Sequence, residues 1–227
     1  MIEKLKSGEE VLRNDTVYPE SCPLDRVIPA RRDTLSFTDD PVPDEVLHDI
    51  LELGLLAPSG YNLQPWRFVV VRDPGVKRRL RGAAMGQKQV EEAPVVIVAC
   101  GDPTAWKQDL EEMIHMGEEL GAIDDTSAAG IRKNAPAYLE SYSPEMWVTR
   151  QVSIAFTHLM LAAEAYGLNT GPMEGFHEDK VRDVLGIPSH VRVIALLALG
   201  YRKGDEKPFG GRFGFHKTVF WNEYGGQ

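Results

Sequence analysis

The amino-acid sequence predicts a mixed fold of helices and strands, of the α+β or the α/β class. Three segments, 66–75, 93–102 and 190–201, contain near-continuous apolar runs that are typical of buried strands. Helical patterns precede and separate these runs, and the longest of them covers residues 143–166. Because apolar runs that alternate with helices occur in sheets buried on both faces, we expect helices on each side of one sheet.

Composition limits the functions that the chain can have. It has 227 residues, 43% of them hydrophobic and 26% charged, which suits one large domain or a domain with an insertion. A formal net charge of -9 disfavours nucleic acid and anionic lipid as partners, because both are themselves negative. No apolar run approaches the ~20 residues of a membrane span, and the N-terminal segment has no hydrophobic signal core.

The distribution of cysteine and histidine argues against disulfide and metal sites. Cys22 falls in a segment without clear periodicity and Cys100 in an apolar run, so no disulfide is expected and the cytoplasm is the default compartment. The six histidines are scattered without ligand spacing, and neither cysteine lies in a glycine-rich nucleophile turn. We therefore predict no metal and no nucleophilic catalytic residue.

Capping residues predict where the two main helices begin and end. Pro43 suits the first position of a helix that ends by Ala57, because Pro58 disfavours helical geometry in the residue before it. The longest helix is expected to begin after Ser143 as N-cap and to end at Gly167. It is apolar over most of its circumference, so we expect it to be central and buried, with a second subunit as a candidate partner.

Two segments differ from this core. Residues 1–28 carry mixed charge and little periodicity, and we interpret them as an N-terminal extension to a single domain over 29–227. Residues 102–142 are acidic with weak strand signals, which predicts a helical insertion or lid. A shorter helix is expected within 178–188, where a glycine and a proline end the pattern.

Polar side chains gather in loops that could bind a ligand. The paired Arg31 and Arg32 could hold a phosphate by charge-assisted hydrogen bonds, although two solvated arginines would give the same pattern. The turn between the first helix and the first strand is rich in short polar residues: Ser59, Gly60, Asn62 and Gln64. Local capping accounts for one or two of them, and the others could meet a polar ligand.

Two further loops are rich in glycine. In 169–176, glycines flank the Pro-Met-Glu sequence at 172–174, which allows the backbone to approach a flat ligand or to form a plain turn. In 207–215, Arg212 lies in a loop that could offer N–H groups to a phosphate or simply connect two elements. The chain has neither the G-x-G-x-x-G fingerprint of a dinucleotide-binding fold nor a G-x-S-x-G nucleophile turn.

Taken together and in order, the four motifs resemble the nitroreductase family of FMN-dependent oxidoreductases. Segment 31–73 looks like the family's N-terminal signature, and it is followed by "APVVIVACGD", "AAEAYGLNTGPMEGF", "VRDVLGIP" and "ALGYR". The resemblance implies an α+β fold, a three-layer α/β/α sandwich with a central, mainly antiparallel sheet and long central helices. It also implies an intertwined homodimer with two FMN sites at the interface, in which the C-terminal tail completes the partner's sheet.

The resemblance assigns residues to the cofactor. The arginines match phosphate contacts, the loop from residue 58 comes from the second subunit, and a backbone N–H near residue 174 would meet flavin N5. Gln89 lies near a position that contacts the pyrimidine side in some relatives. The implied cofactor-binding residues are Arg31, Arg32, Asp33, Leu35, Pro58, Ser59, Gly60, Asn62, Gln89, Pro172, Met173, Glu174, Gly175 and Arg212.

The sequence departs from the family pattern at three places. Asp33 stands where a serine is usual, Leu35 where a basic residue is usual, and Gly210 or Gly211 where a lysine is common. An ionised Asp33 would repel a phosphate, and Leu35 removes a cation near the flavin N1–O2 edge. Since a charged hydrogen bond contributes roughly 1.5–3 kcal/mol, we expect FMN to bind less tightly or to be harder to reduce.

The predicted activity is hydride transfer from NADH or NADPH through flavin N5 to a small organic acceptor such as a nitroaromatic or a quinone. The cofactor carries this chemistry, so no catalytic side chain is assigned. Two alternatives stay open. One is a specialised flavoenzyme on the same scaffold, dehalogenase-like or flavin-destructase-like, in which 102–142 would wall the substrate pocket. The other is a flavin-binding protein without turnover.

Overall fold

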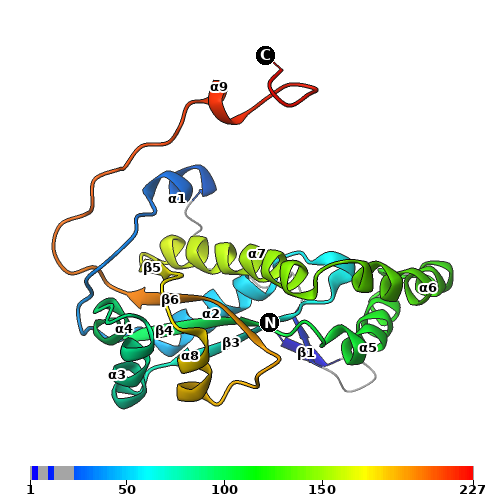
Figure 1. The fold of residues 1–227 in the computed structure, drawn as a ribbon, viewed down its shortest axis with the longest axis horizontal. Coiled ribbons are helices and arrows are strands. Elements are labelled where there is room, and N and C mark those ends of the chain that lie inside the picture. Colours follow the sequence, from blue (N-terminus) through cyan, green and yellow to red (C-terminus); the bar gives the residue numbers. More distant parts are fainter. Residues whose placement is uncertain (1, 5–9, 13–22, 227) are drawn as a thin grey trace.

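The structure is a computed structural model that describes residues 2–4, 10–12 and 23–226. At its centre is a four-stranded antiparallel sheet in the order β3-β4-β6-β5 (Figure 1). The strands are β3 (Trp66–Val71), β4 (Val95–Gly101), β5 (Asn169–Met173) and β6 (Arg192–Gly200). All three predicted strands are confirmed, and β5 adds a fourth strand within one of the glycine-rich loops.

Helices cover both faces of this sheet and give three layers (Figure 1). Alternate residues of β4 point to opposite faces, so that Ile97 lies in one apolar core and Val98 in the other. The first core is covered by α2 (Asp44–Leu55) and α7 (Pro144–Ala165). The second core is covered by α3 (Pro74–Ala83), α4 (Gln89–Glu92) and α8 (Glu178–Leu185). The predicted α/β/α sandwich is therefore confirmed.

Helix ends follow the capping pattern with one difference. Ser143 Oγ accepts a hydrogen bond from the Met146 N–H at 3.4 Å, and Gly167 adopts a φ of 72° just beyond the end of α7, as predicted. Pro43, however, precedes α2 instead of occupying its first turn, because its ψ of 142° is extended. Helix α2 ends at Leu55, shortly before the predicted limit.

Segment 102–142 is helical, as predicted. It forms α5 (Trp106–Glu119) and α6 (Asp125–Ser141), which project beyond one end of the sheet (Figure 1). Asp124 caps α6 by accepting from the Ser127 N–H at 2.7 Å. A role for these helices as a lid stays a prediction.

The N-terminal part of the chain adds elements outside the four-stranded sheet. Strands β1 (Ile2–Lys4) and β2 (Glu10–Leu12) pair with each other, and α1 (Leu24–Ala30) packs on α7 through the buried Val27. Helix α1 therefore crosses the predicted boundary at residue 28, while Cys22 lies outside the described residues.

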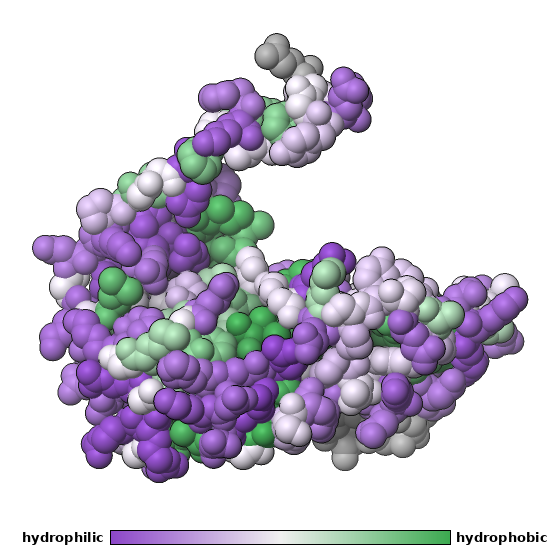
Figure 2. Space-filling model, viewed as in Figure 1, coloured by the Kyte–Doolittle hydropathy of each residue, from purple (hydrophilic) through white to green (hydrophobic). Residues whose placement is uncertain are grey.

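Beyond β6 the chain forms an arch that stands away from the body (Figures 1 and 2). The arch ends past the short helix α9 (Phe215–Thr218). It exposes large apolar side chains, with Phe209 58% and Phe213 71% exposed. Within the described part of the chain, no helix combines the length and the apolarity that a membrane crossing requires.

Candidate functional site

The segment that follows the arginine pair lies along β5. Asp33 forms a parallel bridge with Thr170, and the Thr34 N–H donates to the Thr170 carbonyl at 2.9 Å. The close approach requires glycine at position 171, because a Cβ there would lie 2.4 Å from the Thr34 carbonyl oxygen. Two predicted motifs that are far apart in sequence are thereby joined into one backbone surface.

The two arginines of the pair have different surroundings. Nη1 of Arg32 donates to the carbonyls of Pro29, Ala30 and Arg31 at 2.5, 3.2 and 3.0 Å, which caps the end of α1. Nη1 of Arg31 is buried and has no hydrogen-bond partner within the described parts of the chain. A buried donor without a partner is rare and requires an explanation. Arg31 is thus the guanidinium with a free donor for an anion.

Other groups on the joined 31–34 and β5 segments and on α7 are consistent with an anion site. The hydroxyls of Thr34 and Thr170 are buried and, among the described residues, unpartnered. Burial raises the pKa of Glu164 on α7, and the positive charge of Arg31 offsets this only in part. Oε2 of Glu164 is likewise buried without a hydrogen-bond partner among the described residues, so this carboxyl does not satisfy Nη1 of Arg31. The donor set therefore fits a phosphate group.

The loop after β6 returns to this site. Nζ of Lys207 lies 3.4 Å from Oδ2 of Asp33. The guanidinium carbons of Arg32 and Arg212 lie 5.0 and 5.3 Å from the centre of the Phe209 ring, within the range of cation–π contacts. The structure thus brings the predicted Arg212 loop to the arginine pair.

The turn between α3 and α4 borders the end of β5. Nε2 of Gln87 donates to the Gly175 carbonyl at 2.7 Å, and Nε2 of the buried Gln89 donates to Oε1 of Gln87 at 3.1 Å. Met85 beside them is 61% exposed and has a φ of 55°, which is uncommon for a residue other than glycine. The predicted Gln89 therefore contacts β5 only indirectly, through its hydrogen bond to Gln87. Sequence reasoning missed Gln87 and Met85, whose only local signal is the turn glycine Gly86.

Two predicted residues at this end are open to solvent. Leu35 is 46% exposed, and Glu174 after β5 is also exposed. Pro172 and Met173 belong to β5 itself, where they pair with Leu197 and Leu196 of β6. The backbone beyond β5 is therefore the part that is free to meet a ligand.

The polar loop around η1 (Gly60–Asn62) holds an unusual backbone conformation. Tyr61, Asn62 and Gln64 have φ values of 53°, 54° and 45°. Such angles are costly for residues with a side chain and persist where the surroundings impose them, often at binding sites. Ser59 Oγ accepts from the Gln64 N–H at 2.9 Å, so Ser59 is a local cap. No hydrogen bond from the Asn62 side-chain amide to a described residue is found, which leaves this amide free for a ligand.

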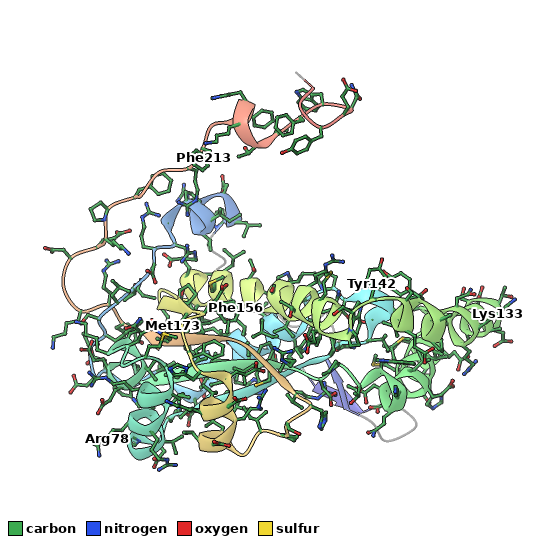
Figure 3. The ribbon with its side chains drawn as sticks, viewed as in Figure 1. Arg78, Lys133, Tyr142, Phe156, Met173 and Phe213 are labelled. Carbon is green, nitrogen blue, oxygen red and sulfur yellow. The ribbon has the colours of Figure 1, made fainter. Side chains whose placement is uncertain are left out.

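The predicted site residues divide into two groups that lie beside opposite halves of α7. The Gly60 N–H donates to Gln151 Oε1 at 2.9 Å, whereas Arg31 lies near Glu164. Roughly 20 Å of helix separates Gln151 from Glu164 at the usual rise per residue. Figure 3 shows the length of this helix, with Tyr142 near one end of α7 and Met173 near the other. A single chain does not bring both groups to one small ligand.

A cavity lies beside the polar loop. Its volume is about 590 Å³, within the range of small-molecule pockets, and α5 forms one of its walls. The lining is apolar at Leu63, Met113 and Met116, while Arg67 and Asp109 form an ion pair of 2.8 Å at the polar part. The predicted helical insertion thus contributes to a pocket that also contains Asn62.

Cys100 is a poor candidate for chemistry. It is buried within β4, and its burial, together with the charge of Glu178, raises the pKa of its thiol to about 12. A thiol that stays protonated at neutral pH is a weak nucleophile.

Comparison with known proteins agrees with this architecture. The model of the nitroreductase family matches residues 28–201. A Thermus thermophilus protein named NADH dehydrogenase is 44% identical over 191 residues, which cover 84% of this chain and 92% of that protein. A Staphylococcus haemolyticus protein, named as an NAD(P)H nitroreductase, is 31% identical over 73% of this chain and 82% of its own.

A solved structure shows the same fold. A protein from Exiguobacterium sibiricum, crystallised in complex with FMN, superposes with a TM-score of 0.81 at 25% identity, over 88% of this chain and 98% of its own. Together with the family match over most of the described domain, this confirms the resemblance found in the sequence. The chain belongs to the nitroreductase family.

Proposed function

We propose that this protein is an FMN-dependent oxidoreductase that uses NADH or NADPH to reduce a small organic acceptor such as a nitroaromatic or a quinone. The observation that carries the proposal is the buried, unpartnered Nη1 of Arg31 beside the backbone surface of Asp33 and Gly171. The relatives named for NADH or NAD(P)H and the fold neighbour crystallised with FMN support the same activity.

Different residues would bind the phosphate and the ring system of FMN. Arg31 and Arg212 would hold the phosphate, because a guanidinium offers paired donors to it. The backbone after β5, at 174–175, would lie against the ring system, with Gln87 fixing the Gly175 carbonyl. When bound, FMN supplies the hydride chemistry, while the chain orients it and excludes water.

A homodimer would bring the two groups of site residues together. The outward face of α7 exposes Ile154 at 39% and Met146 at 51%. Ser153, which lies between them in the helix, is exposed as well. Exposed apolar side chains on a central helix are typical of an interface. Two α7 helices paired antiparallel about a two-fold axis would place the 58–62 loop of one chain beside Arg31 of the other.

The cavity beside α5 supports a pocket for the acceptor. It combines apolar side chains with a few polar groups, which is typical of sites for small organic molecules. One observation favours the non-catalytic alternative: Leu35 leaves the site without the cation that stabilises a reduced flavin in relatives.

The test is flavin binding followed by reduction. Purified protein saturated with FMN is mixed anaerobically with NADH or NADPH, and flavin absorbance is followed by stopped flow. We expect bleaching with at least one nicotinamide and re-oxidation by a quinone. Binding without bleaching would favour the non-catalytic alternative, and a protein that does not bind FMN would contradict both.

A further inference from the structure

A lysine–aspartate pair lies at the phosphate end of the proposed site. Nζ of Lys207 is 3.4 Å from Oδ2 of Asp33, and the two side chains are 54% and 39% exposed. Asp33 forms the bridge to Thr170 and lies two residues after Arg31, whose buried Nη1 lacks a partner in the described structure. A carboxylate and a lysine therefore lie on the same segments as the free guanidinium donor and the second predicted arginine loop.

Other contacts hold the segment that carries Lys207. Glu206 pairs with Arg32 at 3.6 Å and with Arg202 at 3.8 Å. The Phe209 ring contacts the Arg32 guanidinium. The position of Lys207 thus depends on its neighbours as well as on its ion pair.

The chemistry of the pair follows from its charges. An ionised carboxylate accepts hydrogen bonds but donates none, so an unpaired Asp33 would repel a phosphate. Lys207 balances that charge, and its ammonium has three donors, of which the contact with Asp33 uses one. The pair therefore presents N–H donors in place of a net negative charge. Because exposed ion pairs contribute little to folding, the pair can be altered to test ligand binding with little effect on stability.

We propose that Lys207 and Asp33 act as one unit that admits the phosphate of FMN and so sets the preference of this chain for phosphorylated over unphosphorylated flavin. The inference rests on the proposed FMN-dependent function. It makes Lys207 a specificity-determining residue and explains how Asp33 is compatible with a phosphate.

The experiment measures binding of FMN and of riboflavin, which lacks the phosphate, by quenching of flavin fluorescence. The full chain, freed of flavin, is compared with Lys207→Met, Asp33→Ser and the double variant. We expect Lys207→Met to raise the Kd for FMN at least tenfold and to change the Kd for riboflavin less than twofold. Adding Asp33→Ser should return the FMN Kd to within threefold of the original, because the repelling carboxylate is gone.

Controls separate the pair from general charge effects. Lys203→Met removes a positive charge from the same exposed segment and should change the FMN Kd less than twofold. Far-UV circular dichroism and thermal midpoints should be unchanged in all variants, since both side chains of the pair are well exposed.

Three results would overturn the inference. Lys207→Met could leave FMN binding unchanged, it could weaken both flavins equally, or Asp33→Ser could fail to restore binding. If the unaltered chain binds neither flavin, the proposed function itself fails and this inference with it. If the unaltered chain binds FMN normally and only these variants disagree, the inference alone fails.

Discussion

The backbone N–H of Gly60 donates a hydrogen bond of 2.9 Å to Oε1 of Gln151, across 91 residues of sequence. This contact ties the polar loop to α7, the helix whose outward face we propose as the dimer interface. Three residues of the loop also have positive φ, a costly conformation that persists where the surroundings stabilise it. Gln151 is therefore a positioning residue for the loop that we expect to meet the partner's flavin.

Replacing Gln151 tests this role. Gln151→Leu should lower the free energy of unfolding by about 1 kcal/mol, the usual contribution of one hydrogen bond. It should also raise the FMN Kd at least fivefold, because the loop is no longer held in place. Gln151→Glu keeps an acceptor at the same position and should restore most of the binding. Equal FMN binding by the leucine variant would show that the loop is positioned by other contacts.

Asn62 separates ligand binding from local capping. Asn62→Gly tolerates the φ of 54° and removes an amide that has no hydrogen bond to a described residue. We expect weaker FMN binding with a free energy of unfolding within about 0.5 kcal/mol of the original. Ser59→Ala, the matched control, removes a cap and should lower the free energy of unfolding by about 1 kcal/mol. The reverse pattern would mean that Asn62 serves only the turn.

Gly171 tests the close approach of the 31–35 segment to β5. In Gly171→Ala, the new Cβ would lie 2.4 Å from the Thr34 carbonyl oxygen, so one backbone segment must move. We expect destabilisation of about 1–3 kcal/mol and loss of FMN binding. Gly82→Ala on α3, where the added Cβ meets open space, should instead stabilise the fold by up to about 1 kcal/mol. Both are read from urea unfolding curves, and unchanged stability in the Gly171→Ala variant would contradict the predicted clash.

Ile154 tests the proposed interface. Ile154→Glu puts a charge on the outward face of α7 and should convert a dimer to a monomer in light scattering, with loss of FMN. Arg79→Glu on the exposed face of α3 changes charge elsewhere and should leave the mass unchanged. A dimer that persists in Ile154→Glu would place the interface on another surface.

Glu178 predicts how stability depends on pH. Burial alone would raise the pKa of this carboxyl, but hydrogen bonds from Arg192 and the Val193 N–H outweigh it and hold the pKa below its usual value of 4.5. Its stabilising effect is therefore complete above pH 4.5 and is lost as the pH falls through the lower, folded-state pKa.

Substitution at this position should follow the same pH dependence. Glu178→Gln should lower the free energy of unfolding by about 1.5–3 kcal/mol at pH 7, and the difference from the original should shrink as the pH is lowered toward 3. Glu111→Gln removes an exposed partner of Arg132 and should have an effect below about 1 kcal/mol. A Glu178→Gln effect that does not change with pH would show that packing, not charge, is responsible.

The sequence by itself determined the elements and the family. The apolar run of β4 and the cap at Ser143 act over a few residues, so their pattern is visible without the fold. The arginine pair, the polar loop and the two glycine-rich loops could likewise be singled out, because each is a short segment of unusual composition. What each residue contacts was not visible at that level.

Tertiary structure decided the division of roles. Arg32 donates hydrogen bonds at the end of α1, whereas Arg31 keeps a free buried donor. The two residues are adjacent arginines, so the sequence does not distinguish them. The fold also hydrogen-bonds Gln89 to Gln87 and pairs Lys207 with Asp33. It also put the polar loop and Arg31 beside opposite halves of α7, the arrangement from which we infer two subunits. These outcomes depend on packing between segments far apart in the chain, and local propensity carries no information about such contacts.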